Sequence, residues 1–209
     1  TYIRAEESET LASFDDMTLV DLIVEKDEKG TDSLPESIKK NPESMSETIE
    51  NNVRRLIIDE MPVNPKYYEE MSRLLDELIE QRRREATDYQ KYLEKVIALA
   101  KKVRKPESGS DYPKGITTPA LRALFDNLEE IENNQAAEPE ESYGNDNPKT
   151  IRAQKAIELD KAIQEAREAS WRGNIFKERK IRKAIKSVVG DNNELADNLL
   201  EIARNQHEY

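Results

Sequence analysis

The chain has 209 residues, of which 36% are hydrophobic and 37% are charged, and its formal net charge at pH 7 is −11. This length is enough for one large or two small domains, and the hydrophobic content is lean but sufficient for a helical core. The acidic balance argues against a simple nucleic-acid coat, because phosphate binding needs positive surface. The apolar runs are too short to predict a membrane span.

The composition also bounds the fold and the chemistry. Without cysteine, the chain has no disulfide, no thiol nucleophile and no thiolate metal ligand. With no export signal either, it fits a reducing compartment, and we expect a cytoplasmic protein. Glycine and phenylalanine are scarce, whereas Glu, Lys, Arg, Ala and Leu dominate the periodic segments. The sequence therefore predicts an all-α fold, an irregular helical domain built around a long helix pair.

Taken in chain order, the first candidate helix covers Phe14–Val24, where apolar residues gather. Asn41 and Pro42 then provide an N-cap and a first-turn proline for a second helix with apolar residues at helical spacing. We expect that helix to end near Glu60, because the two prolines of Met61–Pro65 stop a helix.

The next helix has Asn64 as its predicted N-cap and Pro65 at its first position. Its apolar stripe starts at Tyr68 and continues in three- and four-residue steps as far as Val103, the period of an amphipathic helix. We expect the helix pair around Pro62 to form the centre of the fold. The side chains predicted to be largely buried are Tyr68, Met71, Leu75, Leu78 and Ile79.

Three further helices follow in the second half of the chain, the first two opened by Thr118–Pro119 and Asn147–Pro148. The second of these should bury Ile151. A basic helix then begins after Gly173–Asn174 and is expected to stop at Gly190 as a left-handed cap would stop it.

A last helix follows Asp191, which forms a capping-box pattern with Glu194. Residues 133–148 have almost nothing to bury, and we expect a linker or mobile loop there. The expected domain organisation is therefore an acidic N-terminal segment with the central helical core (1–132), the linker, and C-terminal helices that pack on the core (149–209).

Patterns that carry catalysis are missing from the sequence. It has no Gly-rich phosphate loop and no H-E-x-x-H spacing. The one histidine, His207, is expected to be solvated, and Asp59–Glu60 is interpreted as a helix end, since no strand or phosphate loop precedes it. We expect no catalytic residue, no metal site and no cofactor in this chain. Four tyrosines are interpreted as packing residues more than as base-stacking ones: Tyr67, Tyr68, Tyr89 and Tyr92.

Charge is distributed unevenly along the chain. Residues 1–50 contain fourteen acids against five bases, whereas Trp171–Lys186 contains seven bases against one acid, Glu178. A cluster of bases favours an anionic partner, although a solvated helix face is the alternative for each basic run. The candidate DNA- or partner-binding residues are Arg82, Arg83, Arg84, Trp171, Arg172, Lys177, Lys180 and Lys183.

Three stretches carry a family resemblance. They are LASFDDMTLVDLIVE (Leu11–Glu25), ENNVRRLIIDE with the following NPKYYEEMSRLLDELIEQRR (Glu50–Arg83), and WRGNIFKERKIRKAI (Trp171–Ile185). Together they resemble the C-terminal part of the R (motor and restriction) subunit of type I restriction-modification enzymes. In that family a nuclease domain and two ATP-driven helicase lobes lie upstream of a helical C-terminal region. That region is implicated in docking onto the methyltransferase core and in DNA contact.

The resemblance implies that this chain is the non-catalytic end of a type I site-specific deoxyribonuclease with ATP-dependent translocase activity. The chain begins with threonine, which fits a piece of a longer protein. ATP and magnesium are expected only for the parent subunit. The implied partners are the methyltransferase and specificity subunits and double-stranded DNA, and no membrane is expected. The alternative is a stand-alone helical adaptor or regulator that binds protein or RNA.

Overall fold

The computed structural model describes residue 20 and residues 42–84, 89–106, 112–128 and 147–209. Within these residues it contains seven α-helices and no strand, so the predicted all-α fold is confirmed. Of the helix expected at Phe14–Val24, only Val20 is described, and its side chain is buried. Of the connection predicted at 133–148, residues 133–146 lie outside the described residues.

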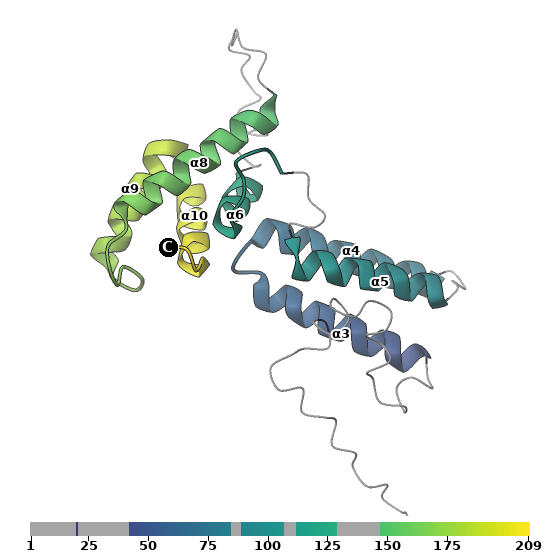
Figure 1. Ribbon diagram of the computed structural model, residues 1–209. Helices are drawn as coiled ribbons and strands as arrows, with labels where there is room; N and C mark the ends of the chain where they lie inside the picture. The colour runs from purple at the N-terminus through teal and green to yellow at the C-terminus, as the bar shows by residue number, and fades with distance from the viewer. Residues whose placement is uncertain (1–19, 21–41, 85–88, 107–111, 129–146) are drawn as a thin grey trace, which may run out of the picture. The chain divides into compact units, whose positions relative to one another are not determined.

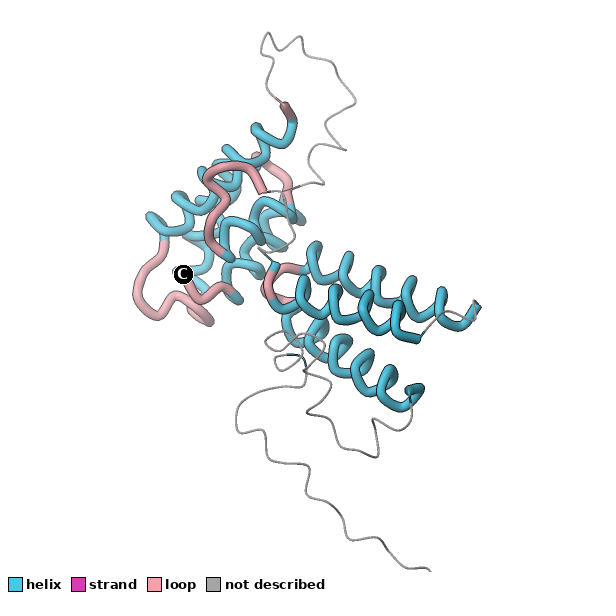
Figure 2. The backbone as a smooth tube through the Cα atoms, turned by 45° about the vertical axis from the view of Figure 1, so that its right-hand side comes forward, coloured by secondary structure: helices cyan, strands magenta, loops and turns pink. Residues whose placement is uncertain are grey.

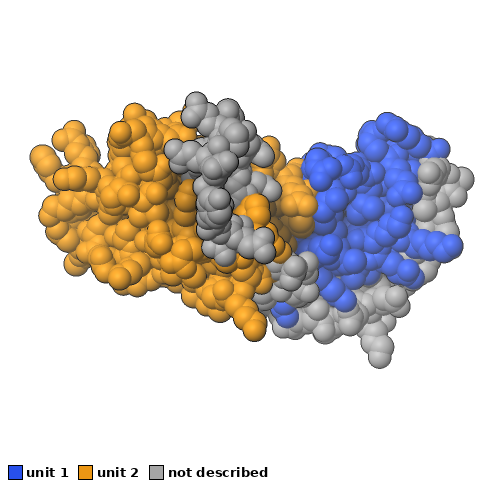
Figure 3. All heavy atoms as spheres, turned by 90° about the horizontal axis from the view of Figure 1, so that it is seen from above, with its two compact units in different colours: residues 1–56, 73–109 blue, residues 57–72, 110–209 orange. Residues whose placement is uncertain are grey.

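The chain forms two compact units, which Figure 3 colours separately. Unit 1 comprises residues 1–56 and 73–109, and unit 2 comprises residues 57–72 and 110–209. The domain division expected from the sequence stays a prediction. The bounds of the two units differ from it, because both units are made of segments that are separated in the sequence.

Unit 1 is built from parts of α3 (Pro42–Glu60) and α4 (Pro65–Arg84) together with α5 (Tyr89–Arg104). The helices lie side by side in both backbone views (Figures 1 and 2). In the described part of this unit, the buried hydrophobic side chains include those of Val20, Ile49, Val53, Leu75, Tyr92, Leu93, Val96, Ile97, Leu99, Ala100 and Val103.

The predicted break at Met61–Pro65 is confirmed, because α3 ends at Glu60 and α4 begins at Pro65. The Asn64 side chain caps α4, and its Oδ1 accepts a hydrogen bond from the backbone N–H of Tyr67 at 3.4 Å. Three of the five side chains predicted to be buried in α4 are buried and two are half-buried. The buried ones are Tyr68, Met71 and Leu75, and the half-buried ones are Leu78 and Ile79.

The apolar stripe that runs to Val103 belongs to two helices instead of one. Helix α4 ends at Arg84 and α5 begins at Tyr89. No proline or glycine marks this interruption in the sequence. The signal that was available is weaker: Thr87 and Asp88 are poor helix formers, and Asp88 directly precedes the first residue of α5, where an N-cap residue is preferred.

Unit 2 contains α6 (Pro119–Asn127), α8 (Pro148–Ala166), α9 (Ile175–Val189) and α10 (Asn193–Asn205). Helix α8 packs on α6 and on α9, and α10 packs on α9 and on α6 (Figure 1). All four contribute to one hydrophobic core, whose fully buried side chains include Leu124, Leu128, Leu159, Ile163, Ile181, Ile185 and Leu199.

Local signals placed the starts of α6 and α8 correctly. The Thr118 hydroxyl accepts a hydrogen bond from the Leu121 N–H at 3.2 Å. The Asn147 side chain accepts one from the Lys149 N–H at 3.1 Å. In both helices proline occupies the first turn, where its missing N–H leaves no bond unmade.

Two expectations about unit 2 are wrong. Ile151 is 47% exposed, because its position five residues before the buried Ala156 turns it well away from the buried side of α8. The N-cap of α10 is Asn192, whose side chain accepts from the Leu195 N–H at 3.0 Å, and not Asp191. Both residue types suit a cap, so the sequence alone left the start of α10 uncertain by one residue.

Candidate interaction surface on α9

Residues of its own sequence fix both ends of helix α9. The Asn174 side chain accepts hydrogen bonds from the backbone N–H groups of Phe176 and Lys177 at 3.1 and 3.3 Å. At the other end Gly190 has a φ of 80° and donates its N–H to the Lys186 carbonyl at 2.9 Å, so the predicted glycine stop is confirmed.

The single acid of the basic stretch holds α9 to α10. Glu178 is buried, and its two oxygens accept from Arg204 Nε and Nη2 at 3.1 and 2.7 Å. Its Oε1 also accepts from the Gly173 N–H at 2.8 Å. The bond from Arg204, followed by that from Gly173, lowers the pKa of Glu178 below its ordinary value. Glu178 is therefore a bracing residue of the fold.

Trp171 and Arg172 were both predicted to bind a partner, but both side chains make contacts within unit 2. Trp171 is only 3% exposed and belongs to the hydrophobic core of unit 2. The Arg172 guanidinium lies over its ring, 4.9 Å from the centroid. Arg172 also donates to the backbone carbonyls of Arg204 at 2.8 Å and Gln206 at 2.5 Å. The tryptophan is thus a packing residue here and not an exposed anchor, because the turn before α9 directs its ring inward.

Lys177 and Lys180 both turn toward Glu168, which lies just after α8. The Lys180 ammonium contacts Glu168 Oε1 at 2.5 Å, and Lys177 is 4.0 Å from Oε2. Lys177 also donates to the Ala169 carbonyl at 2.5 Å. The hydrogen bond and charge of Lys180 lower the pKa of Glu168. Two of the predicted binding lysines therefore have an intramolecular partner.

Two more bases of the stretch pair with acids at or near α10. Arg182 reaches the two oxygens of Asp197 at 2.5 and 3.0 Å, and this hydrogen bonding lowers the pKa of the aspartate. Lys186 lies 3.0 Å from Asp191 Oδ1. Through these ion pairs, Arg182 and Lys186 of α9 contact acids at or just before α10.

Besides Lys180 and Ser187, α9 exposes four side chains that we call the α9 outer face: Ile175, Phe176, Arg179 and Lys183. Ile175 is 63% exposed and Phe176 is 76% exposed. In the described part of the chain neither Arg179 nor Lys183 forms an ion pair, and both are exposed. Helical spacing places Phe176, Arg179 and Lys183 together, turned away from the buried Ile181.

Sequence reasoning named only Lys183 from this face among the candidate site residues. A signal for the other members was present. Ile175 and Phe176 follow the N-cap Asn174 directly, and their helical neighbour one turn on is Arg179 and not the buried Ile181. An apolar pair out of register with the buried side of a helix predicts exposed hydrophobic surface.

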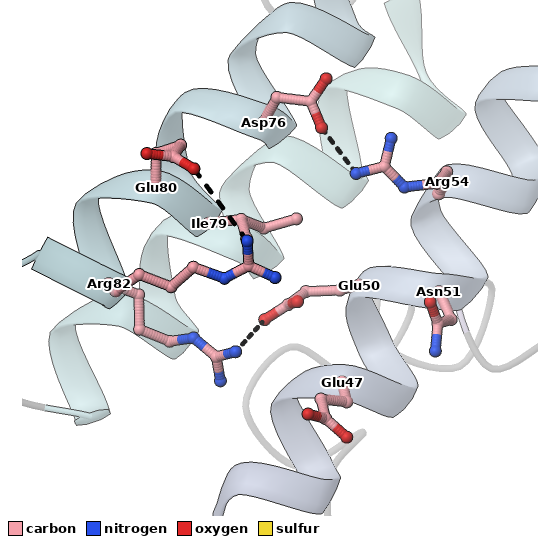
Figure 4. A pocket seen from close by; sticks show the side chains of 9 residues that line it. Glu47, Glu50, Asn51, Arg54, Asp76, Ile79, Glu80 and Arg82 are labelled. Atoms are coloured by element: carbon pink, nitrogen blue, oxygen red, sulfur yellow. Dashed lines mark hydrogen bonds and ion pairs between the residues drawn. The ribbon is translucent and has the colours of Figure 1, made fainter.

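Two members of the other predicted binding group, Arg82 and Arg83, line a cleft of about 400 Å³ between α3 and α4 in unit 1, and Arg84 is not among its lining residues. The cleft is lined by Glu47, Glu50, Asn51, Arg54, Asp76, Ile79, Glu80, Arg82 and Arg83. Figure 4 shows Arg82 extending from α4 toward Glu50 on α3, with Arg54 and Asp76 facing each other nearby. Acids and arginines therefore alternate around this cleft.

Each of the three arginines has an acidic partner. Arg82 is 3.5 Å from Glu50, and its guanidinium lies 5.2 Å from the centroid of the Tyr92 ring. Arg83 and Arg84 contact Glu80 at 4.0 and 3.0 Å. Because these charges are largely balanced within unit 1, the arginine run provides little net positive surface.

Tyr92 has a packing role, as the sequence predicted. Its ring is buried, and its hydroxyl donates to Glu50 Oε1 at 2.5 Å. The same carboxylate therefore joins Arg82 of α4 and Tyr92 of α5 to α3.

The described residues contain no cluster of three or more His, Cys, Asp or Glu able to hold a metal ion. Among the same residues no helix is both long and apolar enough to cross a membrane. His207 is exposed, and Asp59 lies in the last turn of α3.

Comparison with known proteins returned no match among family models, curated proteins or solved structures.

Proposed function

We propose that this chain is the non-catalytic helical region of an R subunit of a type I restriction-modification enzyme. Its role would be assembly with the methyltransferase core, made of methyltransferase and specificity subunits, and contact with double-stranded DNA. The resemblance of Leu11–Glu25, Glu50–Arg83 and Trp171–Ile185 to that family supports the proposal. Under it, ATP, magnesium and nuclease chemistry belong to the parent subunit, which acts in the cytoplasm.

The observation that carries the proposal is the α9 outer face. Its cations and apolar side chains make no contribution to the core of unit 2, whereas most other bases of α9 are engaged within the fold. Exposed aromatic, aliphatic and arginine side chains on one rigid helix are typical of a surface that binds a macromolecule. A catalytic role would need positioned acid–base or metal-binding groups instead.

The test is a pull-down of the purified methyltransferase–specificity complex with the tagged 209-residue chain, with and without duplex DNA. We expect retention without DNA, because an assembly domain binds its partner subunits directly. The same preparation should neither hydrolyse ATP nor cut DNA when magnesium is added. Failure to retain the complex at low salt would contradict the proposal.

A stand-alone adaptor is the second candidate function. It predicts binding to RNA or to an unrelated protein and no affinity for the methyltransferase core. Running structured RNA beside duplex DNA in the same assay separates the two, because only the adaptor should prefer the RNA.

A further inference from the structure

The cleft between α3 and α4 of unit 1 contains a buried carboxylate that its neighbours satisfy only in part. Glu50 lines the cleft and is 7% exposed. Its two contacts, with the Tyr92 hydroxyl at 2.5 Å and with Arg82 at 3.5 Å, are both made by Oε1. Among the described residues Oε2 of Glu50 forms no hydrogen bond or ion pair, although a buried charge is normally paired. One acceptor of Glu50 is therefore available to a ligand in the cleft.

The other charges around the cleft favour a cation as that ligand. The lining has four carboxylates and three arginines. Asp76 is paired with Arg54 at 2.6 Å, and Glu80 is contacted by Arg83 and Arg84 at 4.0 and 3.0 Å. Because arginines neutralise both acids of α4, the two glutamates that α3 contributes determine the sign of the charge inside the cleft.

These two glutamates lie one helical turn apart. Glu47 is exposed, and within the described part of the chain it has no ion pair or hydrogen bond. It precedes Glu50 by three residues, which places the two Cβ atoms about 5–6 Å apart. Figure 4 shows both side chains on the α3 side of the cleft, with Glu50 extending toward Arg82.

Arg82 balances only part of this negative charge. Its distance of 3.5 Å from Glu50 exceeds the roughly 2.7–2.9 Å of a close charge-assisted hydrogen bond. The guanidinium also lies over the Tyr92 ring, 5.2 Å from the centroid, and this contact holds part of the side chain against α5. An ammonium group can therefore reach Glu50 Oε2 while Arg82 keeps its place at Oε1.

The spacing of the two glutamates suits a ligand with two amino groups. One ammonium would donate to Glu50 Oε2 and the other to Glu47, about 5–6 Å away, which a chain of about four methylene groups spans. Ile79 of α4, a half-buried lining residue, offers apolar surface to that chain. The volume of about 400 Å³ is in the range of about 300–1,000 Å³ typical of small-molecule sites.

We propose that this cleft binds a short aliphatic diamine, or the matching segment of a longer polyamine. The two glutamates of α3 bind its ammonium groups, and Ile79 contacts its methylene chain. This proposal is independent of the proposed function, since it uses only the residues of unit 1.

The experiment uses the whole 209-residue chain and two probes, 1,4-diaminobutane and butylamine, which has one amino group fewer. Each is titrated at fixed pH and low salt, and binding is followed by the backbone amide NMR signals of residues 47–54 and 76–83. The test variant is Glu47→Gln. The matched control is Glu94→Gln, which removes an exposed carboxylate of α5 that does not line the cleft.

Wild type should bind 1,4-diaminobutane about fivefold or more tightly than butylamine, because only the diamine contacts both glutamates. Glu47→Gln should remove most of that difference and change the affinity for butylamine less than about twofold. Glu94→Gln should bind both probes as the wild type does. All three proteins should keep the same melting temperature, since both substituted side chains are exposed.

Glu50→Gln is a second variant and should weaken the binding of both probes. Because Glu50 is buried against Tyr92, its fold is checked by circular dichroism. If Glu50→Gln does not fold, the comparison of Glu47→Gln with Glu94→Gln decides the question alone.

Three outcomes overturn the proposal. The first is equal affinity of the wild type for the two probes, or no binding of either. The second is equal weakening of diamine binding by Glu47→Gln and Glu94→Gln, which would indicate attraction to the overall negative charge. The third is displacement of the diamine by an equal concentration of Mg²⁺ with the same signal changes, which would make the cleft an unselective counter-ion site.

Discussion

At the scale of single residues, the clearest feature of unit 2 is the number of polar side chains whose hydrogen bonds join separate segments, which we call braces. Glu178 joins Arg204 and the Gly173 N–H, and Tyr209 donates its hydroxyl to Asp160 Oδ1 at 2.5 Å. Both braces are buried or partly buried, where a lost hydrogen bond leaves its partner unsatisfied. Trp171, the only tryptophan, lies in the same core, so its fluorescence reports the folding of this unit.

Replacing Glu178 by glutamine should lower the free energy of unfolding by about 1–2 kcal/mol at neutral pH. The expected loss of stability is modest because the Arg204 side chain is 36% exposed, so solvent screens its ion pair with Glu178. The measurement is urea unfolding followed by Trp171 fluorescence. Glu165→Gln, which removes an exposed partner of Lys161, is the control and should have little effect.

The same variant gives a pH test. The pKa of Glu178 is lowered in the folded state, so its stabilisation is present above the ordinary glutamate pKa of about 4.3 and is lost as the pH falls through the folded value. The difference between wild type and Glu178→Gln should therefore shrink in acid. A difference that persists unchanged at about pH 2 would show that charge is not what stabilises this contact.

The contribution of Tyr209 to folding stability should depend on pH in the opposite sense. Burial, and next the hydrogen bond to Asp160, raise its pKa above the ordinary value. Its stabilisation is therefore fully present below a pH of about 10 and declines at higher pH, where the unfolded chain ionises more readily. Tyr209→Phe should cost about 1–3 kcal/mol at neutral pH because Asp160 loses a donor.

The measurement for Tyr209 is a series of urea titrations at increasing alkaline pH. Wild type should lose stability faster than Tyr209→Phe above the ordinary tyrosine pKa, so the two curves converge. Parallel curves would contradict the assignment of a buried, protonated phenol.

At the scale of helices, the caps differ in how much surrounding structure depends on them. Asn174 is exposed and caps only α9. Asn64 caps α4 and is buried, and it also joins α6: its Nδ2 donates to Asp126 Oδ2 at 2.7 Å, and its Oδ1 accepts from Asn127 Nδ2 at 2.9 Å. A buried cap with two tertiary partners stabilises more than a solvated one.

Asn64→Ala should therefore destabilise the protein more than Asn174→Ala. A simple cap substitution costs about 0.5–2 kcal/mol, and the loss of buried partners at Asn64 should take its cost above about 2 kcal/mol. Urea unfolding of both variants, followed by Trp171 fluorescence, gives the comparison. Equal losses would indicate that the contacts of Asn64 with α6 contribute nothing measurable.

Helix boundaries were the part of the fold that the sequence predicted best, because caps and prolines act locally. Asn64, Thr118 and Asn147 begin helices where expected, and Gly190 ends one. The interruption between α4 and α5 was missed because neither proline nor glycine marks it. The apolar period alone does not say whether one helix or two carry a stripe.

The candidate site was harder to predict because its character depends on contacts between distant residues. The sequence gives the seven bases around α9 but not their partners: Lys180 meets Glu168 and Arg182 meets Asp197 only after the helices pack. Likewise the burial of Trp171 depends on the turn before α9. What a run of basic residues offers to a partner is its charge minus the charge that folding neutralises.

At the scale of the whole molecule, unit 2 is discontinuous in the sequence. Residues 57–72 belong with residues 110–209, and specific bonds within the unit connect the two segments. Gln206 donates from its Nε2 to the Val63 carbonyl at 2.7 Å, and Asn64 bonds to Asp126 and Asn127. The last residues and the proline corner are thus parts of one structure.

A fragment of residues 110–209 should consequently unfold at a lower urea concentration than the whole chain, with Trp171 fluorescence as the common probe. Without Val63 and Asn64, the buried Gln206 and the partly buried Asp126 lose hydrogen-bond partners, and the loss should exceed about 2 kcal/mol. Coincident midpoints would contradict the discontinuous unit. The full chain carrying Gln206→Ala is an intermediate case and should fall between the two.

The interleaving of the two units also sets an order of events during synthesis on the ribosome. The helices of unit 1 are complete once Arg104 has been made, whereas the corner at Val63 meets its partner Gln206 only about a hundred residues later. At about 5–20 residues per second this delay is roughly 5–20 s, long compared with the formation of helices. During that time residues 57–72 have been translated, but the segment that completes their unit does not yet exist. The nascent chain therefore holds a finished unit 1 while unit 2 is still incomplete, and unit 2 cannot form its contact with Val63 until Gln206 has been made.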